Sequence, residues 1–464
     1  MAYIENYYID KYGVQFSKDK KTLIAVPEDY KGIYEIPFGT ITVEPDAFFN
    51  CKHITAIIIP STVEDIFEPF AGAGSEYFVD SCSNLAYFFV DSKNKNYYTI
   101  EGVLCEKERD GGNDMVIAYP PAKKSTFILP PNLSIIGALW NSLCILEHLK
   151  IENSHSLYAM KDGAIYNKEL STLIQAPINQ RRYIMPDSIE KFELGAFSGC
   201  KKLTSIQLGQ SFVGCVNGDG VFYSDFIDCT SLRTIKVHPD NKKYHTENGY
   251  LFEGYGYGIG YTHEELIFCP QAYKPKTFWI PDTEKISEGA FTNCRYFNTP
   301  VLNCHNSIPL YIGANAFDGT PFYSNQENWK DGILIGAAIL IKVSEEYKQN
   351  KLVIPRGVPG ITVDNSINNE HITEIEIEDG YSFFNSRALN CPNLRTIKFP
   401  KILANSCLHG SIISLLEHCP KLEKILIPQG TRDFFLRYSN PNLHELMIEY
   451  DLDNNEIGKI HMTE

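Results

Sequence analysis

One segment of the chain reads Ala47-Phe48-Phe49-Asn50-Cys51-Lys52-His53-Ile54-Thr55-Ala56-Ile57-Ile58-Ile59-Pro60, and its spacing indicates the architecture of the whole protein. The small residue Cys51 is followed by apolar residues three, six and eight positions later, and the phrase closes on proline. Ile57 and Ile59 are two residues apart, so they share one face of a short strand. Pro60 cannot donate a ladder hydrogen bond, so pairing ends there.

The same phrase returns along the chain, and recurrence indicates stacked units that share a continuous core. Although 464 residues could form several domains, repetition favours one long array. We therefore expect a single β-rich solenoid over residues 1–464, with a capping hairpin at 1–30 and a second cap at 440–464. The residues expected to open the phrases, as an inward structural ladder, are Cys51, Cys82, Cys200, Cys229, Cys294, Asn369, Cys391, Cys419 and Asn440.

A second recurring piece lies just upstream of several phrases, at Ala47-Phe48, Ala196-Phe197, Ala290-Phe291 and Ala316-Phe317. The ladder residue follows three positions after each phenylalanine, which is about one helical turn. This spacing predicts short helical or irregular segments on the convex side, with both side chains inward. Cysteine, asparagine and threonine, as at Thr320, share a short side chain that can reach backbone groups at a bend.

A longer unit is interleaved with the first and begins with Asp-Gly or Asn-Gly pairs. These pairs favour positive φ angles and predict tight turns that lead into β-hairpins. The clearest copies start at Asp162-Gly163 and Asn248-Gly249, an earlier copy runs from Gly13, and two weaker copies start at Glu101-Gly102 and Asp331-Gly332. The glycine-rich run at residues 254–260 is then the lengthened tip of a hairpin, because no Lys-Ser or Lys-Thr follows it as in a phosphate loop.

The combination of Gly-Ala-Phe-x-x-Cys-x-x-Leu-x-x-Ile-x-Leu with Asp-Gly hairpin insertions resembles the BspA-like leucine-rich repeat proteins of bacteria and protists. The resemblance covers roughly residues 10–450. It implies a curved, right-handed leucine-rich repeat solenoid with a parallel sheet, inserted β-hairpins and short convex helices. It also implies a surface-exposed protein of the kind involved in adhesion or host-protein binding.

Net charge and apolar content argue against nucleic acid as a partner and against insertion into a membrane. The net charge of −15 opposes binding to nucleic acid, and no apolar run is long enough to cross a bilayer. The first residues show no export signal, which leaves a surface location open and keeps an intracellular scaffold as the alternative. Most of the 13 cysteines occupy positions that call for a small apolar group, so we expect free core thiols in preference to disulfides.

The search for chemistry yields no catalytic residue, no cofactor site and no metal motif, so we expect a non-enzyme and, by default, a monomer. Cys215, Cys304 and Cys407 lie outside the ladder positions, but loop or core packing is the favoured interpretation. Glu374, Glu376 and Glu378 alternate along one strand. A solvated strand face is the default interpretation there, with calcium binding or an acidic contact surface as the alternative.

The best indication of binding comes from strand positions between the core residues. Ile58, Tyr87 and Phe89 are apolar there, whereas the middle repeats show Lys150, Gln207 and Lys236. Apolar residues exposed on neighbouring strands can form a contact patch for a protein or glycan partner. The alternative is that the inserted hairpins cover them. A third hypothesis, an enzyme within the hairpin insertions, would need a deep pocket with a shifted carboxylate or a bound metal.

Overall fold

A computed structural model describes residues 7–66, 79, 81–108, 111–135, 148–216, 222–257, 261–281, 283–298, 300–302, 311–336, 339–356, 360–361, 363–379, 383–384, 387–401, 416, 418–451, 453–454 and 456–459. The chain divides into two compact units. The first comprises residues 1–203, 211–220 and 224–229, and the second comprises residues 204–210, 221–223 and 230–464. That residues 1–464 form one continuous array therefore stays a prediction.

In the first unit, short parallel strands form what we call the face sheet, and hairpins feed a second row of strands. The face strands are β4 (Gly32–Glu35), β6 (Ile54–Ile59), β8 (Tyr87–Val90), β12 (Phe127–Ile128), β13 (Leu149–Lys150) and β17 (Arg182–Ile184). The hairpin row contains β1 (Tyr7–Ile9), β2 (Gln15–Ser17), β3 (Thr22–Ala25), β5 (Thr42–Val43), β7 (Asp65–Ile66), β9 (Tyr97–Ile100), β10 (Val103–Glu106), β11 (Met115–Ala118), β14 (Tyr158–Lys161), β15 (Ala164–Asn167), β16 (Thr172–Gln175), β18 (Lys191–Phe192) and β20 (Gly214–Cys215).

The second unit repeats this arrangement. Its face strands are β19 (Ser205–Leu208), β21 (Thr234–Val237), β25 (Phe278–Ile280), β27 (Pro300–Leu302), β32 (Lys351–Ile354), β35 (Glu374–Ile377), β38 (Thr396–Lys398), β39 (Lys424–Pro428), β40 (Met447–Tyr450) and β41 (Glu456–Lys459). The remaining strands are β22 (Tyr244–Glu247), β23 (Tyr250–Tyr257), β24 (Tyr261–Phe268), β26 (Lys285–Ile286), β28 (Tyr311–Ile312), β29 (Trp329–Lys330), β30 (Ile333–Gly336), β31 (Ile339–Val343), β33 (Gly360–Ile361), β34 (Ile367–Asn368), β36 (Phe383–Phe384) and β37 (Leu389–Asn390).

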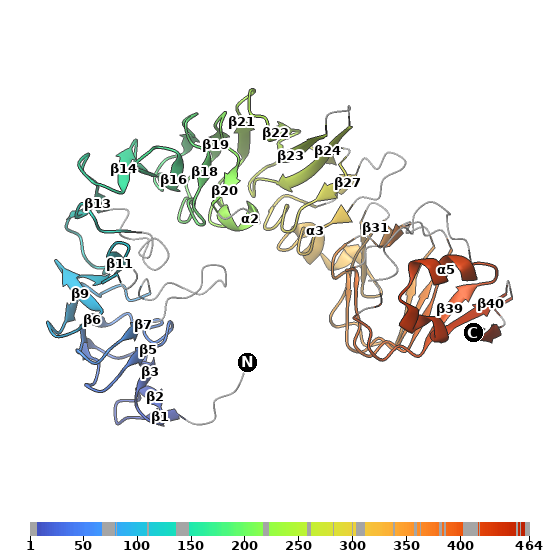
Figure 1. The fold of residues 1–464 in the computed structure, drawn as a ribbon, viewed down its shortest axis with the longest axis horizontal. Helices are drawn as coiled ribbons and strands as arrows, with labels where there is room; N and C mark the ends of the chain where they lie inside the picture. The colour runs from blue at the N-terminus through green and yellow to red at the C-terminus, as the bar shows by residue number, and fades with distance from the viewer. Residues whose placement is uncertain are drawn as a thin grey trace. The chain divides into compact units, whose positions relative to one another are not determined.

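One five-stranded pattern occurs four times among the described strands, as β1-β2-β3-β5-β7, β14-β15-β16-β18-β20, β22-β23-β24-β26-β28 and β29-β30-β31-β33-β36. Each begins with an antiparallel hairpin and continues with short parallel strands. In Figure 1 the strands of the first copy lie side by side at the blue end of the chain. The predicted turns are confirmed: Asp162 and Gly163 have φ angles of 52° and 78°, and the Glu101, Asn248 and Asp331 turns match them. The predicted fold class, a β-rich repeat solenoid with inserted hairpins, is likewise confirmed.

The core lies between the face sheet and the hairpin row. In the first unit, Phe16 and Leu23 from the hairpin row pack in one cluster with Ile57 and Phe88 from the face sheet. In the second unit, Ile375 and Ile397 of the face sheet belong to a comparable cluster. Apolar burial between the two rows is therefore the main stabilising term, as in other solenoids.

Few helices occur within the described residues: α2 (Phe222–Asp225), α3 (Pro321–Ser324), α5 (Arg432–Tyr438), η2 (Gln326–Asn328) and η3 (Pro441–Leu446). The Ala-Phe segments fold as successive turns instead of regular helix. For example, the Ala47 N–H donates to Glu44 O and the Cys51 N–H donates to Phe48 O. The turns still place Ala47, Phe48 and Cys51 in the interior, since all three are fully buried. None of these helices is long and apolar enough to span a membrane.

The caps at 1–30 and 440–464 stay predictions. The described strands at each end form an antiparallel pair, as expected for a capping hairpin. β1 pairs antiparallel with β2, and β41 pairs antiparallel with β40. In Figure 1, β39 and β40 lie beside α5 at the red end.

Candidate binding surface

The outward side of the sheet β4-β6-β8 carries two rows of side chains. In register, Ile33 lies beside Ala56 and Ala56 beside Tyr87, while Ile58 lies between Glu35 and Phe89. Inward residues of the same strands, such as Tyr34, Ile57 and Phe88, are buried. Because successive side chains on a strand alternate between faces, both rows lie on the outward side of the sheet, although Ala56 is only 5% exposed.

We call Ile33, Ile58, Tyr87 and Phe89 the aromatic patch. The exposed fraction is 58% for Ile33 and 51% for both Tyr87 and Phe89, whereas Ile58 is half-buried. The Tyr87 and Phe89 rings stack with centroids 6.2 Å apart and an interplanar angle of 27°. Contiguous exposed apolar surface of this kind is typical of interaction sites.

The inserted hairpin contacts the aromatic patch at one edge and leaves it accessible. The Phe88 N–H donates to Gly102 O, which ties β8 to the hairpin turn. A Cβ atom placed on Gly102 would lie only 2.7 Å from Cδ1 of Tyr87, so the turn packs directly against that ring. The alternative that hairpins cover these side chains does not hold for Tyr87 and Phe89, since about half of each remains exposed.

Further exposed apolar residues lie on face strands, and the sequence analysis did not identify them: Ile33, Ile128, Ile184, Trp279 and Val353. The last four are each the middle of three consecutive apolar residues before a proline, as in Phe278-Trp279-Ile280-Pro281. Phe278 and Ile280 are buried, while Trp279 is 48% exposed. Alternation on a strand requires this, because three successive side chains cannot all face the core. The signal was therefore present in the sequence.

The acidic row of the second unit is paired with basic side chains. Lys351 Nζ lies 2.9 Å from Glu374 Oε1 and 2.8 Å from Glu376 Oε2, and Lys398 Nζ lies 2.9 Å from Glu376 Oε1. Hydrogen bonds from Lys351 and Lys398 hold the pKa of Glu376 below its usual value. Glu378 accepts a hydrogen bond from the Arg356 N–H. Glu374 and Glu376 are thus paired with lysines on a half-exposed strand face, and Glu378 is hydrogen-bonded to the backbone.

The predicted ladder residues other than Asn440 lie in the interior, and most of them donate to a carbonyl of the preceding turn. Cys51 Sγ lies 3.4 Å from Val26 O, and Cys82 Sγ lies 3.3 Å from Phe48 O. The same kind of contact joins Cys200 to Ala176, Cys229 to Phe197, Cys294 to Cys269 and Cys391 to Ile367. Cys419 is also buried.

The asparagines at ladder positions behave differently from each other. Asn369 donates from Nδ2 to Tyr347 O across the turns. Asn440 is half-buried and accepts from the Asn442 N–H, so it caps η3 locally. Thr320 likewise makes local bonds at the start of α3, where its hydroxyl accepts from the Tyr323 N–H.

The buried thiols are expected to be unreactive in the folded protein. Ten described cysteines are free and buried. Burial raises the pKa of the Cys51 thiol to about 11 and that of Cys200 to about 12. Since the thiolate is the reactive form, these groups are inert near neutral pH. Of the three cysteines outside the ladder, Cys215 is buried with Sγ 3.2 Å from Asp225 Oδ2, and Cys304 and Cys407 lie outside the described residues.

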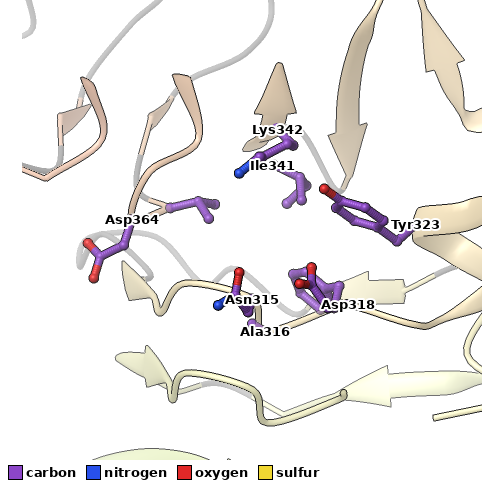
Figure 2. Close-up of a pocket in the computed structure, with 9 residues that line it drawn as sticks. Asn315, Ala316, Asp318, Tyr323, Ile341, Lys342 and Asp364 are labelled. Atoms are coloured by element: carbon purple, nitrogen blue, oxygen red, sulfur yellow. The ribbon is translucent and has the colours of Figure 1, made fainter. Parts of the chain in front are cut away.

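One partly open hollow in the second unit is too small for an organic substrate. Figure 2 shows Asn315 and Asp318 facing Lys342 and Tyr323 across it, while the carboxylate of Asp364 points away. Its volume of about 20 Å³ holds a single water molecule. Burial raises the pKa of Asp318, and nearby Lys342 partly offsets that rise. Over the described part of the chain, no group of three or more His, Cys, Asp or Glu side chains is placed to hold a metal ion.

The comparison with protein families agrees with this architecture. The profile of the BspA type leucine rich repeat region matches in six copies, over residues 33–98, 176–254 and 345–435. A leucine rich cell surface protein from Faecalibacterium prausnitzii is 17% identical, with 93% of this chain and 97% of that chain covered and a TM-score of 0.27. The pneumococcal vaccine antigen PcpA is 13% identical, with 87% and 81% covered and a TM-score of 0.30. The comparison with curated proteins found no match.

Proposed function

Because this chain belongs to the BspA-type leucine-rich repeat family, we propose that it is a non-enzymatic binding protein whose face sheet recognises a protein partner. The observation that carries the proposal is the aromatic patch on β4, β6 and β8. Four apolar side chains are held side by side there by strand register, and the Glu101-Gly102 turn supports one end.

The physical argument is that the aromatic patch gains free energy when water is removed from it. Burying apolar area contributes about 25 cal/mol per Å², and aromatic side chains dominate the energetics of many interfaces. Both rings are held on a hydrogen-bonded strand, so little further ordering is needed when a partner docks. At the β4 margin of the apolar centre, the exposed charged residue Glu35 lies beside Ile58 in register.

Two settings are proposed for this binding. Adhesion at a cell surface is what membership of the family suggests for the partner-binding role. The alternative is an intracellular scaffold, which the ten free, buried cysteines favour, because disulfides are rare in reducing compartments. Fractionation of native cells distinguishes the two settings: recovery with the envelope supports adhesion, and recovery with the cytosol supports the scaffold.

Affinity capture tests the role of the aromatic patch. Wild-type protein is compared with a Tyr87→Glu, Phe89→Glu double variant and with a Phe38→Glu control, in which an 80% exposed apolar side chain lies outside the face strands. We expect a partner retained by wild type and control and weakened at least about thirtyfold by the double variant, as for loss of a hot spot. Equal retention by a double variant whose thermal unfolding is unchanged would show that the aromatic patch is not the binding surface.

A further inference from the structure

A hollow of about 560 Å³ lies in the first unit, among the loops that follow β4, β6 and β8. The residues lining it are Gly39, Ile41, Ser61, Thr62, Val63, Glu64, Lys93, Lys95 and Asn96. This volume is within the usual range for small-molecule sites, about 300–1,000 Å³. Unlike a typical drug pocket, the hollow is lined mainly by hydroxyl, amide and amino groups. Such a lining matches a hydrated, hydroxyl-rich ligand better than an apolar one.

The charge of the lining favours an anion. Lys93 and Lys95 are both exposed and contribute two ammonium groups against the single carboxylate of Glu64 among the lining residues. Among the lining residues the excess is positive, in contrast to the net charge of −15 for the whole chain. The nearby Asp91 carboxylate already accepts a hydrogen bond from the Lys93 N–H. Lysine binds carboxylate, sulfate or phosphate groups as a point charge.

The loop that carries both lysines is held rigidly by Asn94, which lies between them. Asn94 is buried, and its Nδ2 donates to Pro60 O at 2.9 Å and Val63 O at 3.0 Å. Its Oδ1 accepts from the N–H groups of Asn96 and Tyr97. The backbone on either side of Asn94 is thus fixed before any ligand arrives, which lowers the entropic cost of binding.

A second copy of this loop shows which feature is special to the first. In the second unit Asn241 takes the place of Asn94, and its Oδ1 accepts from the N–H groups of Lys243 and Tyr244. The residue before Asn241 is Asp240, where the first copy has Lys93. The second copy keeps a lysine at the Lys95 position, Lys242, and has Lys243 in place of Asn96. Lys93 is therefore the residue that distinguishes the first copy, and the loop geometry does not require it.

From these observations we propose that the hollow bounded by Ser61, Thr62, Lys93, Lys95 and Asn96 is a binding site for an acidic saccharide. Its carboxylate or sulfate group is bound by the two ammonium groups, and its hydroxyls exchange hydrogen bonds with Ser61, Thr62 and Asn96. The site lies beyond the carboxyl ends of the face strands and is separate from the aromatic patch, so the two can be tested independently.

Titration calorimetry at low ionic strength, where exposed charges are least screened, tests the proposal. The probes are an unsulfated uronic-acid disaccharide, its monosulfated counterpart, a neutral disaccharide and inorganic sulfate. Lys93→Gln, Lys95→Gln is compared with Lys31→Gln, Lys52→Gln, an equal charge change in exposed lysines that precede β4 and β6. Loss of two exposed ion pairs is expected to weaken binding of the acidic disaccharides about fivefold to thirtyfold in the first variant only.

Each outcome of the titration either supports the proposed saccharide site or overturns it. Preference between the uronic and sulfated probes identifies which anionic group the lysines bind, and either preference supports the proposal. Equal binding of the neutral disaccharide, equal binding of sulfate alone, no binding of any probe, or equal losses in both variants would each overturn it. The Tyr87→Glu, Phe89→Glu variant should keep the saccharide affinity, so a failed patch experiment leaves this test intact.

Discussion

Replacing Asn369 with alanine tests whether the ladder depends on hydrogen bonding as well as on size. The Asn369 side chain is 4% exposed. Its Nδ2 donates to Tyr347 O at 3.0 Å and Ser344 O at 3.3 Å, and its Oδ1 accepts from the N–H groups of His371 at 2.8 Å and Ile372 at 3.2 Å. A hydrogen bond of this kind contributes about 1 kcal/mol net, so loss of all four would cost about 4 kcal/mol.

The repeats that have cysteine at the ladder position show how part of this loss of stability can be recovered. There the N–H three positions after the ladder residue bonds to its backbone carbonyl, as Leu394 N does to Cys391 O at 3.1 Å. If the Ile372 N–H makes that bond in the variant, the cost of Asn369→Ala falls to about 3 kcal/mol. Asn369→Cys also restores a weak donor like that of Cys391, so it should cost about 1 kcal/mol less than alanine.

Urea unfolding followed by circular dichroism measures the change in stability, with Asn390→Ala as the matched control. Asn390 is exposed, and within the described residues its amide bonds to Asn368 Oδ1 alone. Its loss should therefore change the free energy of unfolding by no more than about 0.5 kcal/mol. Hydrogen exchange at Tyr347 reports local opening, since repeat arrays need not unfold in two states. The reasoning is refuted if Asn369→Ala is no more destabilising than the control, or if cysteine is no better than alanine.

Three further predictions concern buried groups and one turn. Burial raises the pKa of Asp225 above its unfolded-state value. The neutral carboxyl therefore contributes to the free energy of unfolding in full below the unfolded-state pKa, and this contribution is lost as pH rises through the folded-state pKa. Asp225→Asn should therefore raise the melting temperature at neutral pH but not near pH 3, and an unchanged difference across that range would contradict this. Cys51 and Cys200 should react with a disulfide reagent only after denaturation, because burial raises the pKa of both thiols. Peptide mapping of the labelled sites checks this prediction, and labelling of either cysteine in the native protein would contradict it. Gly102→Ala should destabilise by about 1–2 kcal/mol in thermal unfolding, because φ is 81° and the new Cβ would lie against Tyr87; wild-type stability would show that the ring moves freely.

The sequence predicted those features whose causes are local and periodic. Asp162-Gly163 determines a turn through its own backbone preferences, and Cys51 with Ile57 and Ile59 determines an inward face through spacing alone. The Ala-Phe segments were predicted in part: their phenylalanines are buried, but the chain between strands is too short to sustain regular helix.

Other features could not be predicted because they depend on which strands become neighbours. Counting from the ladder would align Ile425 with Leu446, yet Ile425 pairs with Met447. The slip of one residue accompanies η3, where Asn440 caps the chain locally. Similarly, Ile33 and the predicted patch residue Tyr87 come into one row, with Ala56 between them, only through the register of β4 with β6 and of β6 with β8.

The repeat constrains inward positions and leaves outward positions free, and strands β35 and β8 use that freedom in opposite ways. On β35, Glu374 and Glu376 already have Lys351 as a partner, so a ligand docking there would have to desolvate charges that are satisfied by each other. On β8, the Tyr87 and Phe89 rings stack on each other, and the adjoining turn packs against Tyr87. Removing water from these uncharged rings is favourable. Exposed ion pairs contribute only about 0–1 kcal/mol each to stability, so the charged face of β35 adds little to the fold and offers little to a partner. Recognition of a macromolecule is therefore expected at the aromatic patch, where association buries apolar area without breaking an existing pair.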